Sequence, residues 1–84
     1  MKMLTGLVQR IYVDANATQA CVFIGPTPAN TELLFLPRRD SGPAHTSAFL
    51  TSMLDALGQA LVTAREVVVG HADTGGEIYT VELR

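Results

Sequence analysis

The sequence predicts a small all-β domain in which five strands are accompanied by one helix, placed between the third and fourth strands. Short apolar runs alternate with clusters of turn-forming residues over most of the chain, which is typical of strands. One longer segment, residues 44–64, instead repeats its apolar residues at helical spacing. The chain has 84 residues, so we expect a single domain covering residues 1–84.

The first two predicted strands, residues 6–14 and 19–25, form a hairpin. Alternation in the first strand separates two sets of side chains: Leu7, Ile11 and Val13 on one face, Val8, Arg10, Tyr12 and Asp14 on the other. Residues 14–18 are typical of a turn, because Asp and Asn side chains can bond to the nearby backbone. The second strand is apolar on both faces, which indicates a strand that is central or covered on both sides. Its Cys21, the only cysteine, is expected to be a small core residue.

Two connections flank the third predicted strand, residues 32–37. Residues 26–31 contain two prolines and predict a loop, because proline cannot donate to a strand ladder. Residues 38–43 lead into the helix, and Pro43 suits a first helical turn, where its missing N–H is not needed.

The predicted helix has one apolar face and one small, uncharged face. The apolar face consists of Phe49, Leu50, Met53, Leu54, Leu57, Leu61 and Ala64. The opposite face consists of Ser47, Ala48, Thr51, Ser52, Ala56, Gln59 and Thr63, and Asp55 is the only formal charge of the helix. Such a helix predicts a second partner. We expect a homo-oligomer, with Thr51, Asp55 and Gln59 at its interface. Gly58 indicates close approach of another backbone, or else an end or kink of the helix.

Two further predicted strands, residues 66–70 and 77–83, complete the chain around a tight turn at residues 72–76. Three strands, a helix and two strands is the chain order of the OB-fold, a five-stranded Greek-key barrel. We therefore predict an OB-fold-like barrel. The alternative is an open antiparallel sheet with the helix on one face.

Composition limits the classes of function. The net charge is −2, which makes nucleic acid an unlikely partner because such binders usually carry a basic patch. Hydrophobic residues make up 48% of the chain and charged residues 17%, against a usual ~25%, which favours oligomerisation. No apolar run approaches the ~20 residues of a membrane span, so membrane insertion is not expected. The N-terminus has no signal-peptide pattern, which predicts a cytoplasmic protein, or a secreted one if a leader has been removed.

No chemical site emerges from the motifs. Only His45, His71 and Asp73 resemble metal ligands, and they lack the spacing of a zinc site, so neither metal nor cofactor is predicted. No serine lies in a nucleophile elbow and no acid–base pair is evident, so we expect no catalytic residues and no enzyme. Arg38 and Arg39 are the only basic pair.

The five aromatic residues divide into two groups. Three lie in apolar segments and are expected in the core: Phe23, Phe35 and Phe49. Only Tyr12 and Tyr79 are expected to be exposed. A nucleic-acid-binding OB-fold needs stacking aromatics in a basic groove, so the pattern favours other ligands.

Three apolar patterns carry a resemblance to a known family. They are the helix run Met53-Leu54-x-Ala56-Leu57, the closing strand Ile78-x-x-Val81-x-Leu83 and the opening Gly6-Leu7-Val8-x-x-Ile11-Tyr12-Val13. The first two resemble the B subunits of pentameric bacterial enterotoxins, and the opening is similar to subtilase-cytotoxin-type B subunits. The resemblance implies OB-fold subunits in a five-membered ring that binds cell-surface glycans. The chain shows neither the leader nor the disulfide that those secreted subunits carry.

We therefore expect a non-catalytic oligomeric binding module, an enterotoxin-B-like pentameric ring for glycans or another small polar ligand. The sequence assigns no ligand-binding residue. The alternatives are a single-stranded nucleic-acid-binding OB-fold and a purely structural partner of a larger protein. The sequence pI of about 5.5 disfavours the nucleic-acid alternative.

Overall fold

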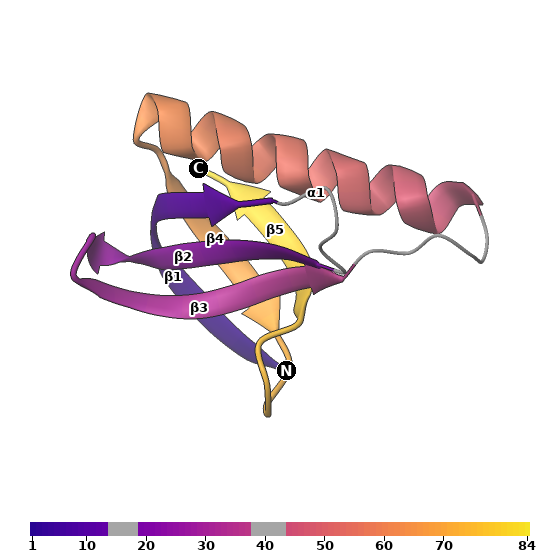
Figure 1. Ribbon diagram of the computed structural model, residues 1–84, viewed down its shortest axis with the longest axis horizontal. Helices are drawn as coiled ribbons and strands as arrows, with labels where there is room; N and C mark the ends of the chain where they lie inside the picture. Colours follow the sequence, from indigo (N-terminus) through magenta and orange to yellow (C-terminus); the bar gives the residue numbers. More distant parts are fainter. Residues whose placement is uncertain (14–18, 38–43) are drawn as a thin grey trace.

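The computed structural model describes residues 1–13, 19–37 and 44–84, which form five strands and one helix (Figure 1). In chain order these are β1 (Lys2–Tyr12), β2 (Gln19–Thr27), β3 (Asn30–Pro37), α1 (Ala44–Thr63), β4 (Glu66–His71) and β5 (Ile78–Leu83). The prediction of a β-rich fold with its helix between the third and fourth strands is confirmed. No helix within the described residues combines the length and apolarity needed to cross a membrane.

The strands form one antiparallel sheet in the order β3-β2-β1-β4-β5. The long strand β1 pairs with β4 through its first half and with β2 through its second half. The two edge strands approach each other at the far side of the sheet. There the Phe35 amide donates a hydrogen bond to the Gly76 carbonyl at 2.8 Å, and Phe35 forms an isolated parallel bridge with Glu77. The sheet is therefore curled rather than flat.

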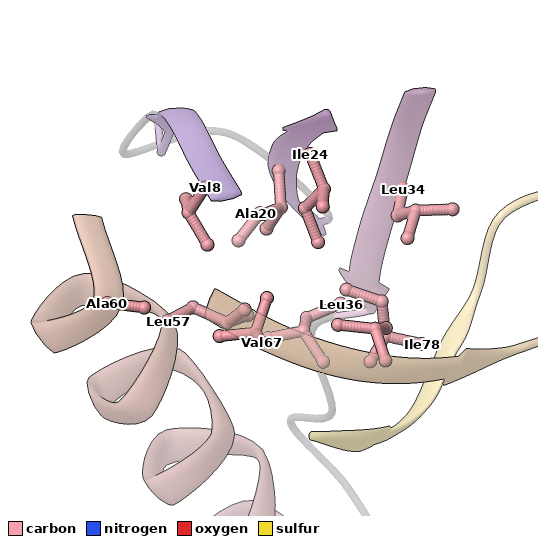
Figure 2. Packing of buried hydrophobic residues seen from close by; sticks show 11 residues of the cluster. Val8, Ala20, Ile24, Leu34, Leu36, Leu57, Ala60, Val67 and Ile78 are labelled. Atoms are coloured by element: carbon pink, nitrogen blue, oxygen red, sulfur yellow. The ribbon is translucent and has the colours of Figure 1, made fainter. Parts of the chain in front are cut away.

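The hydrophobic core lies inside this curl. Its fully buried large side chains come from β2, β3, β4 and α1: Ile24, Leu34, Leu57, Val22, Val67 and Val69. Figure 2 shows side chains of β1, β2 and β3 directed towards Leu57 of α1 and Val67 of β4. Burial of these apolar surfaces is the main stabilising contribution to the fold.

Burial varies along helix α1, of which residues 49–63 have described side chains. Leu57 and Ala60 are fully buried, whereas 63% of Phe49 is exposed. The first turns of the helix extend past the strands (Figure 1), so they have less sheet to pack against. The prediction that Phe49 belongs to the core is therefore wrong. Leu50, Met53 and Leu54 of the predicted apolar face do pack against the core, whereas Leu61, near the other end of the helix, is 38% exposed.

The helix ends at Thr63, one residue before its predicted end. Ala64 has a left-handed backbone, with φ of 54°, and the Arg65 amide bonds to the Ala60 carbonyl at 3.1 Å. This is the Schellman pattern, in which glycine is the usual residue at the left-handed position. The helix continues through Gly58, and among the described residues no atom outside the helix's own backbone lies within 4 Å of where a Cβ would be, so no other described segment approaches it closely.

The second hairpin is longer than predicted. Residues 26–31 are not a loop, because β2 reaches Thr27 and β3 begins at Asn30, opposite it. Pro26 is tolerated because the register shifts between Ile24 and Thr27, and proline fits a bulge where no ladder bond is needed. Strand β1 likewise begins at Lys2, four residues earlier than expected.

Candidate functional site

The outward side of β1, β2 and β3 carries a continuous set of apolar and aromatic side chains, which we call the aromatic face. It consists of Arg10, Tyr12, Cys21, Phe23, Leu33 and Phe35. Their strand neighbours Val22, Ile24 and Leu34 point into the core. Because side chains alternate along a strand, the aromatic face lies opposite the core and away from α1.

Cross-strand pairing arranges the aromatic face in two rows. Phe23 lies opposite Arg10 on one side and Leu33 on the other. Cys21 lies between Tyr12 and Phe35 in the same way. Directly opposed side chains in an antiparallel sheet are about 4.5–5.5 Å apart at Cβ. The two rows therefore form a contiguous surface rather than scattered contacts.

The cation of the aromatic face is held against its rings. The guanidinium carbon of Arg10 lies 5.5 Å from the centre of the Phe23 ring and 6.0 Å from that of Tyr12. Such cation–π contacts contribute ~0.5–1 kcal/mol at exposed sites. Tyr12 is 47% exposed and Leu33 56% exposed, while Phe23, Phe35 and Cys21 are half-buried. Arg10 is thus held by ring contacts, while Tyr12 and Leu33 leave part of the aromatic face accessible.

A β-bulge in β1 determines which side chains belong to the aromatic face. Val8 pairs with Ile24 and Arg10 pairs with Phe23, so Gln9 is an extra residue on β1. Strict alternation from the buried Val8 would have placed Arg10 inside the protein. The predicted faces of this strand, which grouped Val8 with Arg10 and Tyr12, are wrong for this reason.

The bulge is closed by a side-chain hydrogen bond. The Gln9 amide nitrogen, Nε2, donates to the carbonyl oxygen of Gly25 at 3.0 Å. Gly25 lies in a crowded part of the β2–β3 hairpin, where a Cβ would overlap the Asn30 carbonyl oxygen. No side chain fits there, so glycine is required at this position.

The aromatic face was missed by the sequence interpretation. Phe23, Phe35 and Phe49 were all expected in the core, and Cys21 with them; Phe23, Phe35 and Cys21 are half-buried on the outer face, and Phe49 is exposed. An apolar residue on the uncovered side of a central strand has the same local pattern as a core residue. The available signal was the pair Arg10 and Tyr12, whose polar ends mark the outward side of the neighbouring strand.

The second predicted surface is the outer side of α1. Thr51, Asp55 and Gln59 are all exposed there, at a spacing that places them on one side of the helix. Val62, 85% exposed, lies beside them. Among these four side chains only Asp55 is charged.

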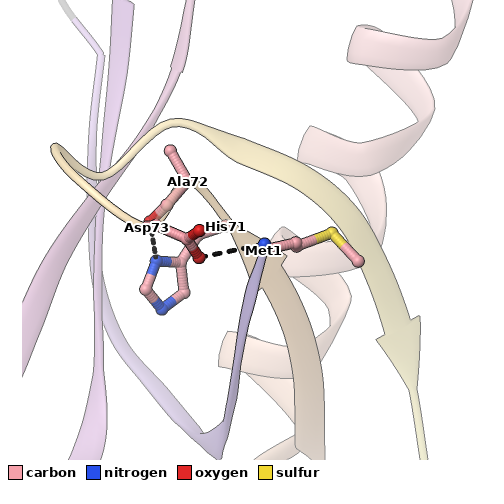
Figure 3. Close-up of polar contacts among 4 residues, drawn as sticks. All are labelled: Met1, His71, Ala72 and Asp73. Carbon is pink, nitrogen blue, oxygen red and sulfur yellow. Dashed lines mark hydrogen bonds and ion pairs between the residues drawn. The ribbon is translucent and has the colours of Figure 1, made fainter.

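The two described metal-ligand candidates, His71 and Asp73, have partners within the protein. His71 is buried and its Nδ1 hydrogen-bonds to the Ala72 carbonyl at 2.9 Å, while Asp73 forms an ion pair with the Met1 ammonium at 2.9 Å (Figure 3). The ammonium, with smaller contributions from Lys2 and His71, lowers the pKa of Asp73. Within the described residues, no three His, Cys, Asp or Glu side chains are grouped as a metal site.

Tyr79 is about as exposed as Tyr12, at 48%, but belongs to β5 and is not part of the aromatic face. It is the extra residue of a bulge in β5.

Several sequence-based candidates lie outside the described residues. They are the turn at 14–18, Arg38, Arg39, Pro43 and the side chains of His45, Ser47 and Ala48. No family model, curated protein or solved structure matches this chain.

Proposed function

We propose that the curled sheet is an OB-fold-type barrel. The strand order and the contact of β3 with the β4–β5 connection support this assignment, because an OB-fold is a five-stranded, partly open Greek-key barrel. The outward face of strands 2 and 3 in that fold binds oligonucleotides and oligosaccharides. The aromatic face of this protein occupies the corresponding strands.

We propose that the protein is a non-catalytic binding module whose aromatic face takes a carbohydrate. The observation that carries the proposal is the pair of aromatic rows with Arg10 fixed over Phe23 and Tyr12. Flat rings offer stacking surfaces for the apolar side of a sugar, and Arg10 offers hydrogen-bond donors for its hydroxyl groups.

Charge favours a carbohydrate over a nucleic acid. Arg10 is the one cation that we place on the aromatic face, and the chain carries a net charge of −2. The exposed Glu32 and Asp73 add negative charge elsewhere on the described surface. Affinity for nucleic acid depends mainly on neutralising phosphates, which one arginine supplies poorly. Neutral sugars do not need a basic groove.

The two tyrosines allow a matched test of this proposal. Tyr12→Ala removes a ring of the aromatic face, whereas Tyr79→Ala removes an equally exposed ring from β5. We expect the affinity of the best ligand from a glycan screen to fall about tenfold in Tyr12→Ala, which is ~1.4 kcal/mol, and to stay unchanged in Tyr79→Ala. NMR titration with that glycan measures both. Equal losses in the two variants, or no glycan binding by the wild type, would contradict the proposal.

Single-stranded nucleic acid is the second candidate, and the Arg10 stack favours it. Guanidinium groups and aromatic rings together stack on bases in many single-strand binders. This function predicts that oligonucleotide affinity falls steeply with salt and that Arg10→Ala reduces the salt slope by about one. Fluorescence anisotropy with a labelled oligothymidylate at several salt concentrations distinguishes it from carbohydrate binding.

We also propose that the module is a homo-oligomer, pentameric as the resemblance to enterotoxin B subunits implies, with Thr51, Asp55 and Gln59 at the interface. The support is the weakly charged outer side of α1 and the exposed Val62. We expect light scattering to give a multiple of the 9.0 kDa chain mass. Thr51→Lys should dissociate the oligomer and Thr27→Lys, on the exposed tip of the β2–β3 hairpin, should not. A monomeric wild type refutes the interface.

A further inference from the structure

The bulge in β1 connects the aromatic face to the core. Val8 and Ile11 both contact the core, although they are three positions apart and would face opposite sides of a regular strand. The extra residue between them restores Ile11 to the inside and turns Arg10 and Tyr12 outward. Without a bulge, the charged Arg10 would enter the core, which is very costly.

The core alone does not determine the position of the bulge. Val8 and Ile11 require one extra residue between them, and either Gln9 or Arg10 satisfies this requirement. If Arg10 were the extra residue, Gln9 would stand opposite Phe23 in the ladder. The cation of the face would then lose the position that brings it 5.5 Å from the Phe23 ring.

One contact distinguishes the two positions of the bulge. With Gln9 as the extra residue, its Nε2 reaches the carbonyl oxygen of Gly25, the residue of β2 paired with Leu7. Gly25 is buried, and an unpaired buried carbonyl is unfavourable. The same arrangement places Arg10 opposite Phe23.

We propose that Gln9 is the positioning residue of the ligand-binding face: its hydrogen bond to Gly25 holds the bulge at position 9 and thereby holds Arg10 over Phe23. The inference rests on the proposed function in one respect, that the aromatic face binds a ligand. The geometry of the face does not depend on that function. Gln9 does not touch the ligand. It acts through the position of Arg10, as bulges beside binding sites commonly re-aim a side chain.

The matched variants are Gln9→Met and Gln19→Met. Both replace glutamine with an apolar side chain of similar length, but Gln19 is an exposed residue at the far end of β2. The direct readout is the NMR shift of the Arg10 side-chain protons, which the Phe23 and Tyr12 rings displace upfield. We expect Gln9→Met to lose at least half of this displacement and to bind the glycan about fivefold more weakly, whereas the Arg10 shift should be unchanged in Gln19→Met.

Deletion of Gln9 supplies a rescue. It removes the extra residue, so a regular strand keeps Val8 and Ile11 inside and Arg10 opposite Phe23 without any need for the hydrogen bond. We expect the deletion variant to fold and to retain the Arg10 shift. Deletion of Thr5, in the regular pairing with β4, should instead abolish folding, because a one-residue slip reverses every following side chain.

The outcomes separate the two proposals. An unchanged Arg10 shift in Gln9→Met, a Gln9→Met chain that does not fold at all, or loss of the Arg10 shift in a folded deletion variant overturns the positioning role. If the wild type binds no glycan but Gln9→Met still loses the Arg10 shift, the positioning role stands and the carbohydrate function fails.

Discussion

Strands β1, β2 and β3 carry apolar side chains on both of their faces, and the two faces have opposite surroundings. On the inner face, Val8, Ile24 and Leu34 are covered by α1, β4 and β5. On the outer face, Tyr12 and Leu33 remain about half exposed. Both faces are largely apolar, and the first difference between them is coverage by other elements.

This comparison shows that apolarity by itself does not distinguish a core from a binding surface. What distinguishes the outer face is shape and order. Its aromatic rings lie in cross-strand rows, and its one assigned cation is held over two of them. The inner face consists of aliphatic residues, most of them branched, which suits close packing.

The strongest test of the comparison uses two adjacent leucines of β3. Leu34 is 2% exposed and Leu33 is 56% exposed. We expect Leu34→Ala to lower the free energy of unfolding by about 2–5 kcal/mol, as for other buried leucines. Leu33→Ala should lower it by less than about 1 kcal/mol but weaken ligand binding. Urea titration and glycan titration of both variants measure the contrast, and equal losses of stability would remove the distinction between the faces.

A second change should affect both faces together. Gly76 bonds to Phe35 of β3, and a Cβ on it would lie 2.9 Å from the Leu33 carbonyl oxygen. Gly76→Ala must therefore move β3, which carries Leu33 and Phe35 outward and Leu34 inward. We expect a loss of about 1–3 kcal/mol in stability together with weaker binding. Thermal unfolding and the same titration check it. Retained binding with lower stability would indicate that the aromatic face does not depend on this contact.

A third change should raise the stability of the protein without altering the inner or the outer face of the sheet. Ala64 holds a left-handed conformation that glycine adopts without a steric penalty. Ala64→Gly should raise the free energy of unfolding by about 0.5–1 kcal/mol, with ligand affinity unchanged. Differential scanning calorimetry at several scan rates measures the first quantity. A lower melting temperature would contradict the expectation that the left-handed conformation of Ala64 destabilises the fold.

The smallest expected effect concerns Asp73, which lies on neither face. Its pKa is lowered in the folded protein by the Met1 ammonium, so the pair stabilises the fold when the carboxyl is ionised. That contribution is present above the ordinary aspartate pKa of ~3.9 and is lost as the pH falls through the lowered value. Asp73→Asn should therefore lower the melting temperature slightly at pH 7. The difference should vanish towards pH 2, and a difference that grows in acid would contradict this assignment.

The sequence predicted the order of strands and helix well, but it predicted less well which side of each strand is buried. The chain order, the long helix and the central position of β2 all follow from apolar spacing and turn residues, and the structure has them. The faces of β1 did not follow, because a bulge at Gln9 changes the alternation and depends on the partner strand. The Phe23 and Phe35 assignments failed for a related reason: local pattern does not reveal whether another element covers a strand.

The helix shows the same limitation. Leu57 was placed correctly on the buried side, whereas Phe49 was not, because the length of sheet beneath a helix is a tertiary property. Thr51, Asp55 and Gln59 were placed correctly on the exposed side, since this depends only on helical periodicity. The aromatic face required the register of three strands, which one sequence does not contain.

The contact between Phe35 and Gly76 has a consequence for the motions of the protein. It joins segments that are far apart in the chain, so its formation requires closure of a long loop and belongs among the late events of folding. A single hydrogen bond with an adjacent isolated bridge can also open without loss of the rest of the sheet. The Phe35 amide proton should therefore exchange with solvent faster than the amide protons of the β1–β4 ladder. We therefore expect brief openings of the curled sheet at this contact, in which Leu33 and Phe35 of the aromatic face move together with β3.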